Sequence, residues 1–186
     1  DAIGLWLDHT KARDVLQNVR QDHVLQSSAG AFSETSIAWT PWLRASGGLR
    51  VDGYRFDVRA TSMPANGGVA HAGIESPKGG LVVGPFAGTE FYANAGRGFH
   101  SNDARGATLI VDPATSEPAS RVTPLAPATG AEVGVRTVAI PHVQTSVSLW
   151  ELGLASELVF IGDAGTTEAG RASRRSGVEV ANYYHP

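Results

Sequence analysis

Cysteine is absent from this chain of 186 residues. Its absence excludes disulfide bonds, zinc sites built from thiolates and catalysis by a thiol nucleophile. It leaves the redox compartment of the protein open, because reducing and oxidising environments both tolerate a chain without thiols.

Long apolar runs are missing as well. A membrane-spanning helix needs roughly 20 consecutive apolar residues, and no stretch of the chain approaches that length. Yet 42% of the residues are hydrophobic and the mean hydropathy is −0.09. The apolar residues must therefore be distributed among polar ones, as they are in β-strands with one apolar face.

Motifs for catalysis and for nucleic-acid binding are also lacking. The net charge of −3 argues against nucleic acid as the main partner. No Gly-x-Ser-x-Gly or His-Glu-x-x-His motif occurs, and His9, His23, His71 and His142 are too scattered for a metal-ligand spacing. We expect a protein that is not an enzyme and has no metal site and no cofactor.

Residues 39–58 carry the most informative pattern in the chain. Successive side chains of a strand point to opposite faces, and here one face is apolar and the other polar. Aromatic residues stand at both ends of this stretch, a pattern typical of a transmembrane β-strand between lipid, lumen and two membrane interfaces. The apolar face holds Leu43, Ala45, Leu49 and Val51, the polar face Arg44, Ser46, Arg50 and Asp52, and the aromatic ends Trp39, Trp42, Tyr54 and Phe56.

The whole chain divides into about eight strands joined by alternating long and short connections. In an up-and-down meander this order places all short turns at one end and all long loops at the other, as in transmembrane barrels. The sequence predicts an all-β, antiparallel up-and-down meander that is part of a larger transmembrane β-barrel. Strands are expected near 2–10, 28–40, 43–58, 74–85, 89–99, 130–140, 143–161 and 174–185, with short turns near 41, 87 and 141.

The alternation slips around Tyr54 and again over residues 150–154. Two interpretations stay open for each place. A β-bulge shifts the phase of the strand, or the strand has risen beyond the bilayer, where alternation is no longer required.

Five segments of the chain follow one another with spacings suited to a barrel, and together they cover nearly its whole length. They are residues 39–57, residues 76–85 (Ser-Pro-Lys-Gly-Gly-Leu-Val-Val-Gly-Pro), residues 89–106 (Thr-Glu-Phe-Tyr-Ala-Asn-Ala-Gly-Arg-Gly-Phe-His-Ser-Asn-Asp-Ala-Arg-Gly), residues 130–136 (Gly-Ala-Glu-Val-Gly-Val-Arg), and residues 156–163 followed by 175–179. In this order they resemble the barrel of TonB-dependent outer-membrane receptors.

The resemblance implies a receptor in the bacterial outer membrane that imports a scarce ligand such as an iron–siderophore complex. Its partners would be outer-membrane lipid, the small-molecule ligand and the TonB complex, which such receptors engage through a plug region. The family's barrels have 22 strands and a plug. Residues 1–186 would then be part of one barrel domain, without the plug and incomplete at both ends.

The longest predicted loop begins with side chains suited to ligand contact. The candidates are an imidazole, an amide, a carboxylate and two guanidinium groups, and loops often carry binding residues. The alternative is a loop whose polar side chains satisfy one another and cap local turns. The candidate residues are Arg97, His100, Asn102, Asp103 and Arg105.

Charged residues on the predicted lumen face also have two interpretations. They could select the ligand, or they could form cross-strand pairs that stabilise a wet interior. They are Arg50, Asp52, Arg97, Glu132, Arg136 and Glu179.

Two other architectures compete with the larger barrel. A soluble β-sandwich, such as a carbohydrate-binding module, would use its aromatic residues as a ligand platform. A closed eight-stranded barrel would need its first and last strands to pair. We expect an open sheet with two free edges instead.

Overall fold

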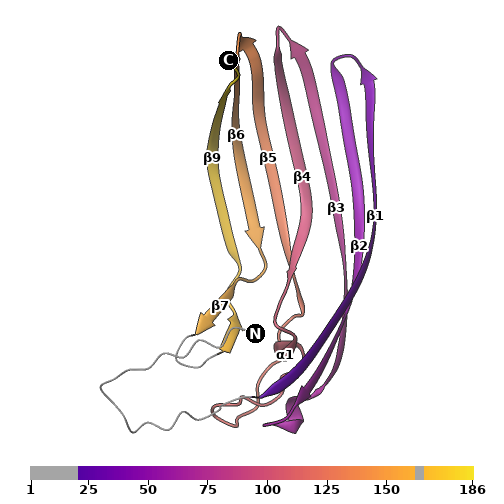
Figure 1. Cartoon of the computed structure of the whole chain (residues 1–186), viewed down its shortest axis with the longest axis vertical. Coiled ribbons are helices and arrows are strands. Elements are labelled where there is room, and N and C mark those ends of the chain that lie inside the picture. The colour runs from indigo at the N-terminus through magenta and orange to yellow at the C-terminus, as the bar shows by residue number, and fades with distance from the viewer. Residues whose placement is uncertain (1–20, 162–165) are drawn as a thin grey trace, which may run out of the picture.

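The computed structural model describes residues 21–161 and 166–186, and its main feature is one curved antiparallel sheet of seven strands (Figure 1). The strands follow one another across the sheet in chain order, which confirms the predicted all-β meander. They are β1 (Asp22–Thr40), β2 (Leu43–Ala60), β3 (Gly68–Phe86), β4 (Thr89–Ser101), β5 (Leu125–Ile140), β6 (Val143–Leu154) and β9 (Ser173–Tyr184).

The connections are sorted by length, as predicted. Two-residue turns join β1 to β2, β3 to β4 and β5 to β6, and all three lie at the top of Figure 1. The long connections 61–67 and 102–124 lie at the opposite end, as do the described residues 155–161 and 166–172 of the third. Gly88, with φ of 78°, supplies the left-handed backbone that the tight turn between β3 and β4 requires.

One predicted strand is wrong and several begin earlier than expected. The strand predicted over 143–161 ends at Leu154, and β7 (Leu158–Ile161) pairs with β8 (Thr166–Ala169) in a separate two-stranded sheet. Alternation cannot detect this break, because both pieces are apolar and β-prone. The strands β1, β3 and β5 begin five or six residues before their predicted starts. The strand predicted at 2–10 lies outside the described residues.

The register of the sheet fixes which face each residue occupies. It runs without a shift through Tyr54 and through residues 150–154. No bulge is present at either place, which rules out the first of the two interpretations. The shifts in register lie next to the short turns instead, between Ala38 and Thr40, Val83 and Phe86, and Thr137 and Ile140.

The aromatic belt expected at Tyr54 and Phe56 is wrong. Both residues share the face of Arg50 and Asp52, and Phe56 is completely buried. The Tyr54 ring stacks on Phe56, with ring centroids 5.9 Å apart, and meets the edge of Phe99 at 5.8 Å. Phe56 is buried and Tyr54 is half-buried because a long loop folds back over this face of the sheet.

A small hydrophobic core lies beneath that loop. It joins Phe56 and Val58 of β2 to Ala104 of the short helix α1 (Ala104–Thr108) and to Leu125 at the start of β5. Burying apolar surface stabilises the contact, so this core holds the 102–124 loop in place.

Two buried asparagines fasten the loops around this core. The side chain of Asn66, at the end of the 3₁₀ helix η1 (Pro64–Asn66), accepts hydrogen bonds from the backbone N–H groups of Ile110 and Val111 and donates one to the Val111 carbonyl. Asn102 donates its side-chain N–H to the Thr123 carbonyl at 2.6 Å. Buried polar groups of this kind are stabilising when they are paired.

The sheet is open in the described part of the chain. Each of β1 and β9 has a single neighbour, and the two do not pair with each other. This arrangement excludes the closed eight-stranded barrel. Within residues 21–161 and 166–186, no helix is long and apolar enough to cross a membrane.

The core under the 102–124 loop should dominate the stability of the loop end. Replacing Phe56 with alanine removes a fully buried ring and should lower the free energy of unfolding by about 3–5 kcal/mol. The matched control is Phe32→Ala, since Phe32 is 74% exposed and its loss should change stability by less than about 0.5 kcal/mol. Urea unfolding in detergent micelles, followed by tryptophan fluorescence, measures both. Equal effects would contradict the assigned core.

Candidate functional site

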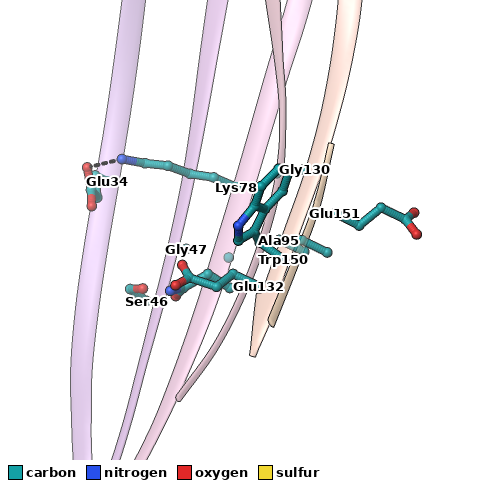
Figure 2. A pocket seen from close by; sticks show the side chains of 13 residues that line it. Glu34, Ser46, Gly47, Lys78, Ala95, Gly130, Glu132, Trp150 and Glu151 are labelled. Atoms are coloured by element: carbon teal, nitrogen blue, oxygen red, sulfur yellow. Dashed lines mark ion pairs between the residues drawn. The ribbon is translucent and has the colours of Figure 1, made fainter. Parts of the chain in front are cut away.

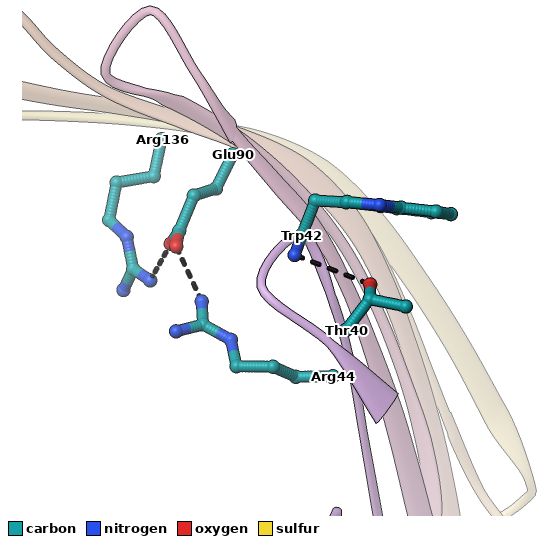
Figure 3. A network of polar contacts seen from close by, with 5 residues as sticks. All are labelled: Thr40, Trp42, Arg44, Glu90 and Arg136. Carbon is teal, nitrogen blue, oxygen red and sulfur yellow. Dashed lines mark hydrogen bonds and ion pairs between the residues drawn. The ribbon is translucent and has the colours of Figure 1, made fainter. Parts of the chain in front are cut away.

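The concave face of the sheet carries a network of three charged side chains near the short turns. Arg44 of β2 and Arg136 of β5 both donate hydrogen bonds to the carboxylate of Glu90 on β4, and the Arg136 bond is 2.5 Å long. Figure 3 shows the three side chains on the inner side of the curve, with the Trp42 ring directed away from them. One carboxylate between two guanidinium groups leaves a net positive charge on this part of the wall.

A second charged pair lies along one strand of the same face. Arg50 donates two hydrogen bonds to Asp52, at 2.7 and 2.6 Å, and Asp52 is only 3% exposed. A bidentate pair of this kind is among the stronger ionic contacts. Gly30 on β1 leaves room for the carboxylate, because a Cβ at that position would collide with it.

A hollow of about 500 Å³ opens in the middle of the concave face (Figure 2). On one side Lys78 reaches across to Glu34, with 2.7 Å between Nζ and the carboxylate. On the other side lie the indole of Trp150 and the carboxylate of Glu132. The floor between them is backbone, since the lining includes Gly47, Gly79, Gly96 and Gly130.

Two large side chains of this face lie flat over glycines of the neighbouring strand. A Cβ at Gly134 would come within 2.5 Å of the Tyr92 ring, and one at Gly177 within 2.7 Å of the Trp150 ring. Tyr92 also donates its hydroxyl hydrogen to Glu132 at 3.1 Å. The glycines therefore allow a close approach that fixes both rings against the wall.

The charged residues predicted for the lumen face form several kinds of contact. The Arg136–Glu90 pair is a cross-strand ion pair, as predicted. Arg50 instead pairs along its own strand, and Glu132 bonds to a tyrosine. Within the described residues, Glu179 faces Ser148 and has no ion pair.

Arg97 does not share the concave face with these groups. It lies in β4 opposite Thr129, and the register gives it the face of Phe91, Ala93 and Ala95. Its side chain is exposed, and it forms no ion pair with the described part of the chain.

The remaining predicted site residues lie close together at the start of the 102–124 loop. Asp103 caps α1 by accepting the backbone N–H of Arg105 at 2.9 Å, and its carboxylate also binds the Arg105 guanidinium. This partner raises the pKa of Arg105 above its usual value. Asn102 is 3% exposed and holds the loop, and His100 lies opposite Ala126. The contacts of Asn102, Asp103 and Arg105 are thus made within the loop.

Of the groups that line the hollow, sequence reasoning singled out Glu132 and missed three others. Lys78, Glu34 and Trp150 alternate onto the polar face of their strands, which is the signal that could have found them. Their meeting depends on the register across six strands, and one chain's periodicity does not supply that register. In the described residues, no three His, Asp or Glu side chains lie close enough to hold a metal ion.

Solved structures with a similar fold are outer-membrane transporters and receptors. The copper transporter OprC superposes with a TM-score of 0.69 at 19% identity, over 87% of this chain and 27% of that one. The FrpB iron transporter from Neisseria meningitidis gives 0.62 at 16% identity, over 88% and 24%. BauA, the ferric preacinetobactin receptor from Acinetobacter baumannii, gives 0.64 at 15% identity, over 89% and 24%.

The chain thus spans about a quarter of the length of these proteins, and at such identities the likeness establishes the fold alone. No curated protein sequence matches the chain significantly. The family model for the TonB dependent receptor-like β-barrel matches residues 7–185. Members of this family are outer-membrane receptors and transporters. With nearly all of its length matched, the chain belongs to the TonB-dependent receptor β-barrel family.

Proposed function

We propose that this chain forms part of the barrel wall of an outer-membrane receptor that imports a scarce small-molecule ligand. The observation that carries the proposal is a curved sheet of this family with an apolar convex face and a charged, hollowed concave face. In such a receptor the convex face meets lipid and the concave face lines the path of the ligand. Residues 1–186 would all belong to this one barrel domain.

A metal chelate, such as an iron–siderophore complex, is the ligand class that we propose. Its support is the set of ligands named for the similar structures, which are copper, iron and ferric preacinetobactin. Import would draw on the TonB complex, as the family name implies. The alternative of a soluble carbohydrate-binding sandwich is not favoured, because no second sheet covers the convex face in the described part of the chain.

Lipid is the partner proposed for the convex face. Large apolar side chains recur there on every strand of the sheet and stay at least 40% exposed, which only an apolar solvent would favour. They are Ile37, Leu49, Val51, Leu81, Phe91, Val133, Leu149, Val178 and Val180.

An arginine on the convex face should therefore destabilise the protein in a bilayer. Leu49→Arg should lower the free energy of unfolding by about 2–4 kcal/mol if the residue lies near the bilayer midplane. Asn94→Arg is the matched control, since Asn94 is exposed on the concave face beside Glu132 and should tolerate a cation. Unfolding in lipid vesicles measures both changes. An equal loss of unfolding free energy in the two variants would contradict the assignment of the convex face to lipid.

The sorted connections predict a sidedness that whole cells can test. Because the chain has no cysteine, a single Ala114→Cys in the 102–124 loop should react with an impermeant thiol reagent added outside. Ala139→Cys, beside a short turn, should react only after the outer membrane is permeabilised. Both alanines are exposed, so accessibility of the side chain does not differ between them. Equal labelling of intact cells would rule out this orientation.

For ligand contact we propose the long-loop end, through Arg97, His100 and Arg105, with Asn102 and Asp103 holding the loop in shape. The support is the exposure of the Arg97 side chain, together with the Arg105 side chain, which is 42% exposed while it is ion-paired with Asp103.

Loss of either cation should weaken ligand binding without unfolding the loop. Arg97→Ala and Arg105→Ala should each cost about 1.5–3 kcal/mol of binding, the usual value of a hydrogen bond to a charged group. The control is Arg59→Ala, an exposed arginine near the end of β2 that is not among the proposed contact residues. Equilibrium binding and TonB-dependent uptake of a panel of radiolabelled iron–siderophores by whole cells provide the measurement. Uptake that is unchanged by removal of TonB would overturn the proposed function itself.

A further inference from the structure

The β3–β4 seam is the line along which these two strands can pair, and backbone pairing is present over only part of its length. The two strands are paired from the short turn as far as Lys78 opposite Gly96, and there the pairing stops. Both strands continue beyond this point. β3 remains paired with β2 down to Gly68, and β4 remains paired with β5 up to Ser101.

A proline stands at the point where the seam opens. Pro77 is the first residue of β3 beyond the last pair, and proline has no N–H to donate to a neighbouring strand. Continuing the register past it would place Glu75 opposite Phe99 and Gly73 opposite Ser101.

Apolar side chains packed against β2 keep the seam open. This apolar wedge consists of Phe99, Leu125 and Ala104. Phe99 has the register of the convex face, yet its ring contacts Tyr54, which lies on the concave face of β2. The end of β4 around Phe99 has therefore crossed over the concave side of β2. Leu125 and Ala104 follow it and are buried against Phe56 in the same core.

This packing leaves polar groups unsatisfied. The described residues contain four buried side-chain atoms with no hydrogen-bond partner: Ser76 Oγ, His100 Nε2, Asn102 Oδ1 and Thr108 Oγ1. All four belong to the elements that border the open seam, namely β3, β4, the 102–124 loop and α1. Buried polar atoms without partners are unfavourable, so apolar packing and polar satisfaction oppose each other here.

We propose that the β3–β4 seam is a two-state joint. In one state, residues 97–125 pack over the concave face of β2 and β3 as the structure has them. In the other, residues 97–101 pair with residues 73–77, and the 102–124 loop is carried away from the concave face. The apolar core favours the first state, and the completed backbone ladder and the released polar groups favour the second. Such balanced packings behave as discrete alternatives, so the joint controls access to the concave face from the long-loop end.

Disulfide trapping in the full chain, folded in detergent micelles, tests the joint. The pair Gly73→Cys and Ser101→Cys is directly opposite only in the closed seam, and a disulfide needs Cα atoms within about 7 Å. The pair Gly79→Cys and Ala95→Cys lies on the short-turn side of the opening, where pairing is already present, and serves as the fold control. We expect slow crosslinking of the first pair in the parent chain and, with Phe99→Ala added, a rise on the order of tenfold.

Two further variants act on the same balance by other routes. Leu125→Ala weakens the wedge from β5, and Pro77→Val gives β3 the missing N–H. Both should raise crosslinking between positions 73 and 101 and leave the pair at 79 and 95 unchanged. The proposal is overturned if none of the three variants raises the crosslinking while the control pair forms normally. It is equally overturned if the parent chain crosslinks at 73 and 101 as fast as the control pair, because the seam would then already be closed.

Discussion

The structure depends on one constraint, which is that successive residues of a paired strand must point to opposite faces. Across seven strands in an unbroken chain-order meander, this alternation divides the molecule into two surfaces of different chemistry. A shift of one residue in any strand would move its apolar set to the concave face. The three shifts in register lie next to the short turns, where they disturb no long stretch of either surface.

The charged side chains of the concave face are mostly arranged in ion pairs. Most of its ionic groups are paired with a neighbour on the same or a nearby strand, so little net charge is left along the wall. The exceptions are the surplus positive charge around Glu90, the Glu132 carboxylate beside Trp150, and Glu179, which has no ion pair within the described residues. Glycines contribute as much as charges do, because the rings of Tyr92 and Trp150 can lie flat only where the adjacent strand has no side chain.

At the long-loop end the sheet is no longer divided into an apolar convex face and a charged concave face. Tyr54 and Phe56 continue the polar face of β2 by register, yet they are apolar, and the 102–124 loop covers them. The loop thereby gains a core of its own and a fixed position, and it leaves buried polar atoms without partners. This end of the sheet has good apolar packing but unsatisfied polar groups, so it is suited to change shape. The continuously paired strands toward the short turns are not.

The strands and their order could be predicted from the sequence, because alternation and turn residues are local signals that a single strand and its neighbours carry. The short turns, the long loops and the faces of Leu49 and Arg50 all follow from them. The same signals misassigned Tyr54 and Phe56 to a membrane interface, since no local pattern reveals that a loop 50 residues later will cover them. They also could not bring Lys78 to Glu34 across β2, or show where the β3–β4 seam opens. Both depend on contacts between segments that do not follow each other in the chain, and only the tertiary structure decides them.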